Sequence, residues 1–350
     1  MQPVKLLALL AGLSVVALGQ KPYTCGTCHT KEAASQPKTP MGRALLSPDA
    51  NAALRSHPSL NFTLGRFRYL IETRGNGSTY SVSDGEKTIS VPIEWTFGAG
   101  AQTFVMKRGE AFVEGLVSYY PEIGGLDVTI GDQALAPKNL EEAFGRPLAS
   151  AEVTACFGCH ATGAVSDGKL NLASLQRGVT CEHCHAGAAS HLNTISQPAA
   201  HRDWKATIPS RLGKQSSESL SNFCGGCHRS WETVVRNNWN GEINVRFQPY
   251  RLANSKCFDG TDSRISCVGC HNPHEDLARN DKQYDPKCLA CHSSAEEPHN
   301  AAMKTAGKSC PVSKENCVSC HMPKVRLPGG HQTFTDHQIR VVKAGEPYPN

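Results

Sequence analysis

Seven copies of the pentad Cys-x-x-Cys-His run through this 350-residue chain, and we number them motif one to motif seven in chain order. They are Cys25-Cys28-His29, Cys156-Cys159-His160, Cys181-Cys184-His185, Cys224-Cys227-His228, Cys267-Cys270-His271, Cys288-Cys291-His292 and Cys317-Cys320-His321. Two thiols at this spacing can each form a thioether to a haem vinyl group, and the adjacent histidine can then bind the iron as its proximal ligand. The repeats therefore predict seven covalently bound haem c groups.

Chance and structural zinc are poor alternatives for these pentads. The chain has 16 cysteines and 15 histidines, and a random shuffle of this composition would contain only about 0.03 such pentads. A zinc site would combine cysteine pairs into fours or place its histidines at longer offsets. Here a histidine follows the second cysteine every time, which favours haem.

The N-terminus has the pattern of a secretory signal peptide. Lys5 precedes an apolar run from Leu6 to Leu18, and the small residues Ala17 and Gly19 surround a plausible cleavage point. The run is too short for a membrane span. We therefore expect residues 1–19 to be removed and the mature protein to have no transmembrane span. We expect it to be periplasmic or extracellular, because thioether attachment is completed and spare cysteines can be oxidised in those compartments.

The uneven spacing of the motifs divides the chain. Motif one stands alone in an N-terminal haem segment (20–59), whereas the other six motifs lie between Cys156 and His321. Fewer than about 30 residues per haem cannot build an ordinary hydrophobic core, so the porphyrins must be the core of a six-haem domain (132–340). A C-terminal tail (341–350) follows.

Between motif one and motif two, aromatic and β-branched runs predict antiparallel strands at 67–73, 78–83, 88–95, 103–107 and 111–120. Gly75-Asn76-Gly77 and Asp84-Gly85 are hairpin signals between them. The predicted fold is thus a multihaem cytochrome c, mostly short α-helices and loops around stacked haems, with a small antiparallel β insertion (60–131). The insertion is expected to cap the haem stack rather than to act as a separate binding module.

The formal net charge of +5 carries little information about partners. Each haem adds two propionates that are ionised near neutral pH, which offsets the basic excess. The charge is therefore no argument for nucleic acid or membrane binding. No Ser/His/Asp triad, phosphate loop or nucleic-acid-binding motif occurs in the sequence, which sets aside hydrolase, kinase and nucleic-acid functions.

From Val153 onward the chain resembles the multihaem cytochrome c superfamily that includes the tetrahaem cytochromes of nitrifying bacteria, the pentahaem nitrite reductases and hydroxylamine oxidoreductase. Four stretches carry the resemblance: TACFGCHATG from Thr154, GVTCEHCHAGAASH from Gly178, SCVGCHNPHE from Ser266, and CVSCHMPK with HQTFTDH from Cys317 to His337. The resemblance implies close-packed haems that conduct electrons, with redox partner proteins such as other cytochromes or a membrane quinol-oxidising complex.

In this superfamily the second axial ligand is usually a histidine from outside the pentad. Matching positions predict distal ligands at His191, His274, His331 and His337, and His57, His201 and His299 complete a set of seven. Met41 is an alternative for the haem of motif one. His183 lies inside motif three and is too constrained to reach the distal face of that haem.

Two further cysteines, Cys257 and Cys310, lie outside every pentad. An exported chain with only two spare thiols predicts a disulfide between them.

Three functional hypotheses follow, and the first is preferred. It is an exported electron-transfer protein whose seven irons are six-coordinate. The second is a multihaem oxidoreductase with one open iron acting on a small nitrogen or sulfur species. Pentahaem nitrite reductases replace the motif histidine of the catalytic haem by lysine, and no Cys-x-x-Cys-Lys occurs here, whereas a site of the hydroxylamine oxidoreductase type is compatible with the motifs. The third is a subunit of a conductive cytochrome filament.

Overall fold

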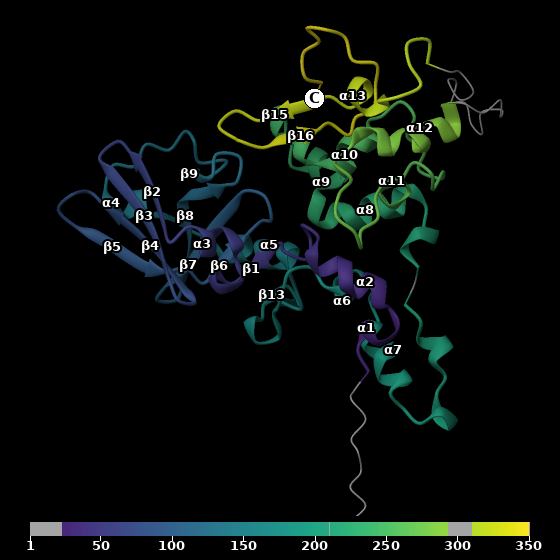
Figure 1. The fold of residues 1–350 in the computed structure, drawn as a ribbon, viewed down its shortest axis with the longest axis horizontal. Helices are drawn as coiled ribbons and strands as arrows, with labels where there is room; N and C mark the ends of the chain where they lie inside the picture. The colour runs from purple at the N-terminus through teal and green to yellow at the C-terminus, as the bar shows by residue number, and fades with distance from the viewer. Residues whose placement is uncertain (1–22, 210, 293–309, 350) are drawn as a thin grey trace, which may run out of the picture.

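A β-rich half and a helix-rich half lie side by side in the computed structural model, which describes residues 23–209, 211–292 and 310–349 (Figure 1). The signal peptide predicted at 1–19 and the predicted ligand His299 lie outside these residues. Within the described ranges, no helix combines the length and the apolar character that a membrane span requires.

Two antiparallel sheets make up the β-rich half. The first has the order β2 (Ser59–Leu64), β3 (Phe67–Arg74), β4 (Gly77–Ser83) and β5 (Thr88–Pro92). The second has the order β1 (Leu45–Leu46), β6 (Trp95–Phe97), β7 (Gln102–Arg108), β8 (Ala111–Tyr120) and β10 (Gly145–Pro147), with β9 (Gly125–Val128) also paired to β8.

The two sheets pack face to face around one apolar core. Ile71 and Tyr80 of the first sheet and Phe104 and Leu116 of the second belong to the same buried cluster. The rings of Tyr80 and Phe104 meet across the interface with centroids 6.5 Å apart. Alternate residues of β3, β4 and β7 point to this core, as antiparallel strands with one buried face require. The β-rich half is therefore a β-sandwich.

Antiparallel strands are present where the sequence predicts them, but the β region extends beyond the predicted bounds 60–131. The run predicted as one strand at 88–95 is split, because Pro92 ends β5 and the chain then crosses to the other sheet as β6. Proline has no N–H to continue a ladder. In addition, β1 and β10 come from the flanking segments, outside the predicted 60–131. Helices and sheets are thus both substantial parts of the fold.

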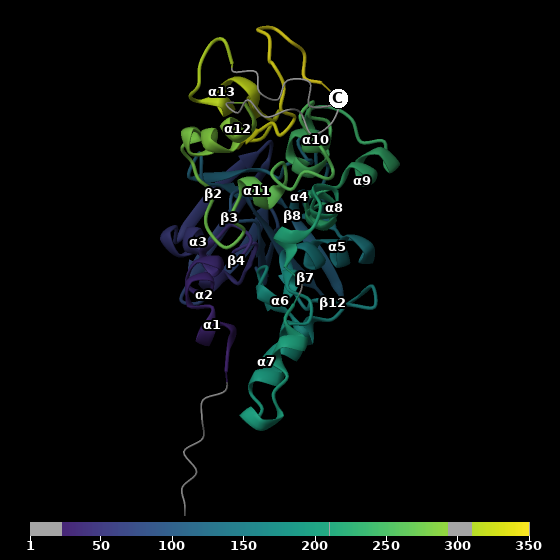
Figure 2. The ribbon, with the colours of Figure 1, turned by 90° about the vertical axis from the view of Figure 1, so that its right-hand side faces the viewer.

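Short helices carry most of the remaining chain. They are α1 (Cys25–Cys28), α2 (Thr30–Ser35), α3 (Ala52–Ser56), α4 (Leu140–Phe144), α5 (Ser150–His160), α6 (Cys181–Cys184), α7 (Ala188–Ile195), α8 (Ser217–His228), α9 (Trp231–Arg236), α10 (Gln248–Ala253), α11 (Cys267–Cys270), α12 (Asp285–His292) and α13 (Cys317–His321). Three small hairpins join them: β11 (Ala161–Thr162) with β14 (Gln176–Arg177), β12 (Val165–Ser166) with β13 (Lys169–Leu170), and β15 (Lys324–Arg326) with β16 (Thr333–Thr335). Figure 1 places β15 and β16 near α10 and α13, and Figure 2 shows the yellow C-terminal segment close to α10 and α13.

An aromatic cluster joins the sandwich to motif two. Phe157, the first residue between the two cysteines of that motif, is 1% exposed. Its ring centroid lies 5.3 Å from that of Trp95 and 5.1 Å from that of Phe97, both in edge-to-face geometry. Such contacts add to the free energy gained from burial. The motif residue is thus part of the core that fixes α5 on the second sheet.

Candidate haem-binding sites

All seven motifs lie on helical turns. In motifs one, three, five and seven the first cysteine starts a short helix, and in motifs two, four and six the motif histidine ends a longer one. Residues three and four apart lie on the same helix face. The spacing therefore directs both thiols and the imidazole of a motif to one side, as attachment of one haem requires.

Thiols of different motifs lie beside one another. Side-chain hydrogen bonds join Cys25 to Cys181, Cys159 to Cys227, Cys224 to Cys267 and Cys288 to Cys317. Cys184 also lies near Cys224, and Cys270 near Cys288, close enough for an electrostatic interaction. The motifs consequently form one succession, one–three–four–five–six–seven, with motif two beside motif four.

Backbone carbonyls hold the Nδ1 atoms of several candidate ligands. Nδ1 lies 2.9 Å from Ala44 O in His160, 2.9 Å from Arg340 O in His321, 2.9 Å from Thr335 O in His337 and 2.8 Å from Ala53 O in His57. Because a carbonyl oxygen only accepts, the Nδ1–H must donate. This tautomer leaves the Nε2 lone pair for a metal, and such a hydrogen bond also fixes the orientation of the ring.

Two motif histidines face a predicted distal histidine. The ring centroids of His185 and His274 are 6.0 Å apart with planes 7° apart, and those of His271 and His337 are 6.1 Å apart with planes 44° apart. An imidazole nitrogen binds a metal at about 2 Å and the ring centre lies about 1 Å behind it, so two axial rings on one iron have centres about 6 Å apart. The separations fit two irons with paired histidines.

Burial favours the neutral form of three candidate ligands, His337, His160 and His271. It lowers the pKa of His337 to about 4 and lowers the pKa of His160 and of His271, since desolvation penalises the charged ring. Only the neutral ring can donate a nitrogen lone pair to iron. Burial likewise raises the pKa of the Cys156 thiol to about 11.

The apolar residues of the helix-rich half also fit large apolar groups. Among the described residues beyond 180, the buried apolar side chains are scattered over several elements: Leu220, Val234, Val245, Leu252, Val318 and Leu327. The two hydrophobic clusters found among the described residues both lie earlier in the chain. Several large apolar side chains are instead exposed here: Trp204, Ile208, Phe223, Trp231, Val235 and Trp239. A segment whose core consists of porphyrin rings has this distribution.

The other predicted distal ligands are spread over the molecule. His57 lies at the end of α3 with its ring 5.4 Å from Tyr119. His191, on α7, has Nδ1 3.4 Å from the Thr207 hydroxyl, and His201 is exposed in the 3-10 turn Ala199–His201.

The surroundings of two further candidate ligands, His331 and Met41, bear on their roles. Nε2 of His331 lies 2.7 Å from Asp127 Oδ2, and this is the nitrogen that an iron would take. The ring centroids of His331 and Tyr120 are 4.8 Å apart. Met41 is half-buried, and its carbonyl accepts a hydrogen bond from Val179 N at 3.0 Å.

The contact between the Met41 segment and motif three depends on two glycines. Gly178 has φ +75°, and a Cβ on it would lie 2.0 Å from Gly42 O. Only glycine tolerates both the left-handed backbone and this approach. Gln36 Nε2 also donates to Val179 O at 2.6 Å. The N-terminal segment is thereby fixed against the residues that precede Cys181.

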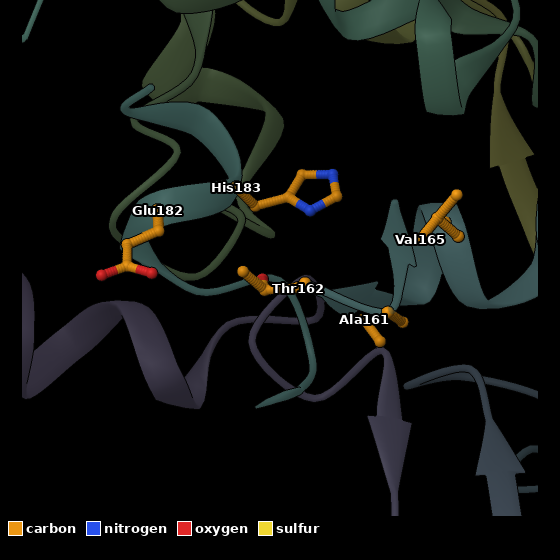
Figure 3. Close-up of a pocket in the computed structure, with 8 residues that line it drawn as sticks. Ala161, Thr162, Val165, Glu182 and His183 are labelled. Atoms are coloured by element: carbon orange, nitrogen blue, oxygen red, sulfur yellow. The ribbon is translucent and has the colours of Figure 1, made fainter. Parts of the chain in front are cut away.

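His183 lies apart from the ring pairs. It lines a pocket of about 350 Å³ between motifs two and three, together with Ala161, Thr162 and Val165. Figure 3 shows its ring pointing to one side of the motif and Glu182 pointing to the other. Its pKa is lowered by burial, and a hydrogen bond with the backbone of Ala161 opposes that shift. Its exclusion as a distal ligand stays a prediction.

The disulfide predicted between Cys257 and Cys310 is not present in the structure. Both are free thiols, Cys257 half-buried and Cys310 exposed. Burial raises the pKa of Cys257 to about 11. The pairing stays a prediction.

Two buried charged groups close to His337 and His321 were not predicted from the sequence. Arg251 of α10 and Asp336 form an ion pair with Nε 2.8 Å from Oδ1, and both side chains are 0% exposed. No local pattern marks them, because 85 positions separate the two residues.

Comparison with known proteins agrees with this geometry. Residues 134–186, which include motif two and motif three, match the family described as cytochrome c554 and c-prime. Over 224 residues the chain is 23% identical to the multiheme cytochrome MtrA of Shewanella baltica. The aligned region covers 63% of this chain and 55% of the relative. These findings support a multihaem c-type cytochrome. The chain spans about half the length of this curated relative, and no solved structure matches it.

Proposed function

We propose that this cytochrome carries seven covalent haems and transfers electrons along them. The observation that carries the proposal is the unbroken succession of neighbouring motifs, in which each motif lies beside at least one other. When bound, haem supplies reversible one-electron chemistry at iron. The chain supplies attachment, axial ligands and fixed spacing.

In this proposal the motif histidines are the proximal ligands and histidines from elsewhere are the distal ones. The 6.0 Å separation of His185 and His274 and the 6.1 Å separation of His271 and His337 support two of these assignments. His57, His191, His201, His299 and His331, with Met41 as the alternative for motif one, are proposed for the remaining irons. Six-coordinate irons change little in structure on reduction, which suits a carrier.

The proposed setting is the periplasm or the cell exterior. The support is the N-terminal pattern of Lys5 followed by the apolar run Leu6 to Leu18, together with covalent haem attachment itself. The proposed partners are other redox proteins, either further cytochromes or a membrane quinol-oxidising complex.

One observation favours a second candidate, an oxidoreductase with one open iron. If His331 keeps Asp127 on its Nε2, and His183 is set aside, six histidines outside the pentads serve seven irons. The seventh iron would then take Met41 or keep an open position for a small nitrogen or sulfur species.

Intact mass and low-temperature EPR of the oxidised protein test both proposals together. We expect a mass that exceeds the mature polypeptide by seven haems, and low-spin ferric signals that account for all the iron. Six or fewer haems in fully matured protein would contradict the count. A high-spin ferric signal worth about one seventh of the iron would favour the oxidoreductase.

A further inference from the structure

One short segment near the C-terminus contacts the candidate ligands of two different motifs. We call residues 335–340 the Asp336 strap. The Thr335 carbonyl accepts the Nδ1–H of His337 at 2.9 Å, and His337 faces His271 of motif five. The Arg340 carbonyl accepts the Nδ1–H of His321, the motif seven histidine, at 2.9 Å. Arg340 N returns a hydrogen bond to His321 O at 3.2 Å.

A buried ion cluster fixes the strap between these two contacts. Arg251 donates from Nε and Nη2 to the two oxygens of Asp336 at 2.8 and 2.9 Å. Arg340 Nη1 donates to Asp336 Oδ2 at 2.7 Å. A guanidinium that engages both oxygens of a carboxylate fixes direction as well as distance. Asp336 is thus tied at once to α10 and to the far end of its own segment.

Ser255, two residues beyond α10, adds uncharged hydrogen bonds to His337 and to Ile339, two residues after it. Its Oγ donates to His337 O at 3.1 Å and accepts from Ile339 N at 2.8 Å. The backbone around His337 is therefore held by both a hydroxyl and a carboxylate, and both anchors depend on the α10 region.

The cluster is poorly explained by stability alone. Replacing a buried ion pair by apolar residues of similar volume is often neutral or stabilising, whereas the pair imposes a defined geometry. The charges are also balanced: Arg251 and Arg340 face Asp336 and Glu346, which lies 3.2 Å from Arg340. What the cluster does impose is the position of two carbonyls, and each of these orients one candidate axial imidazole.

We propose that the Asp336 strap is a shared positioning element that sets the axial imidazoles of motifs five and seven together. This inference rests on the proposed function, because it takes His337 and His321 as iron ligands. The side chains of Asp336, Arg251 and Arg340 are not ligands in this scheme and act through the backbone that orients His337 and His321. A change at Asp336 must therefore alter two irons and spare the rest.

The test is Asp336→Asn in the full, haem-loaded protein, with Glu315→Gln as the matched control. Glu315 precedes motif seven by two residues and forms an exposed ion pair with Lys282 at 2.8 Å. Asp336→Asn should retain seven covalent haems, change the low-spin EPR signals of about two sevenths of the iron, and raise the reduction potentials of the same two haems, because a negative charge beside Arg251 and Arg340 is removed. Glu315→Gln should leave spectrum and potentials unchanged.

A wild-type spectrum and wild-type potentials in Asp336→Asn would overturn the inference, and so would a change confined to one iron. If Asp336→Asn yields no folded protein, Ser255→Ala and Arg251→Lys replace it, since the first removes only a hydroxyl and the second keeps the charge but loses the fork. Unchanged signals in both variants would equally refute the strap.

His337→Ala separates this inference from the proposed function. A new high-spin iron in His337→Ala, together with an unchanged Asp336→Asn, would refute the strap and keep the ligand assignment. A wholly low-spin His337→Ala would refute the ligand assignment itself.

Discussion

The most direct prediction concerns His274, which lies three residues after motif five but faces His185 of motif three. Replacing His274 by alanine removes the proposed distal imidazole and leaves the motif histidine His185 in place. Cys181 and Cys184 stay in place, so the haem of motif three should remain attached. The iron, with one imidazole left, should become five-coordinate and high-spin.

The size of the effect follows from the motif count. One of seven motifs is affected, so the high-spin signal should amount to about one seventh of the iron, with an equal loss of low-spin signal. The planes of His185 and His274 differ by 7° and those of His271 and His337 by 44°. Near-parallel imidazoles give rhombic low-spin spectra and twisted ones more axial spectra, so the loss should fall on a rhombic component.

Quantitative EPR at low temperature is the assay, with added imidazole as a rescue. Imidazole should enter the space of the deleted ring and restore the low-spin signal. His183→Ala is the matched control, because His183 belongs to motif three but lines the pocket beside Ala161. A wholly low-spin His274→Ala, or the same high-spin signal in His183→Ala, would refute the assignment.

Two further predictions address stability and the spare cysteines. Phe157→Ala should lower the free energy of unfolding by about 3–5 kcal/mol, because it empties a fully packed aromatic site. Ile123→Ala, at a residue 48% exposed between β8 and β9, should change it by less than about 0.5 kcal/mol. Chemical denaturation measures both values, and equal losses would contradict the packing argument. Thiol titration of the denatured, non-reduced protein should find no free thiol if Cys257 and Cys310 are bridged, and two titratable thiols would rule the bridge out.

Local patterns predicted the local structure well. The run from Ala111 to Tyr120 is a single strand with the predicted bounds, and the pentads fix helical turns because both cysteines and the histidine must share a face. By contrast, β2 (Ser59–Leu64) was missed although Leu60, Phe62 and Leu64 alternate with more polar residues. That alternation was the signal that could have revealed it.

Partners far apart in sequence escaped prediction for a physical reason. His274 was predicted as a distal ligand, but its position next to motif five gave no hint that it faces His185 of motif three. Similarly, the carbonyls of Ala44 and Arg340 orient His160 and His321, and a backbone carbonyl leaves no mark on residue type. Such contacts depend on the path of the chain rather than on its composition.

The pairing of β1 and β10 with the second sheet affects how this protein can fold and be divided. β1 precedes the inserted strands and pairs with β6, and β10 follows them and pairs with β8. A fragment cut at 60 and 131 would lose both and would leave open strand edges, which favour aggregation. During synthesis the sheet is completed only when residue 147 emerges, nine residues before Cys156. The sandwich and motif two should therefore mature as one unit, and the β-rich half cannot be exchanged between proteins without its two borders.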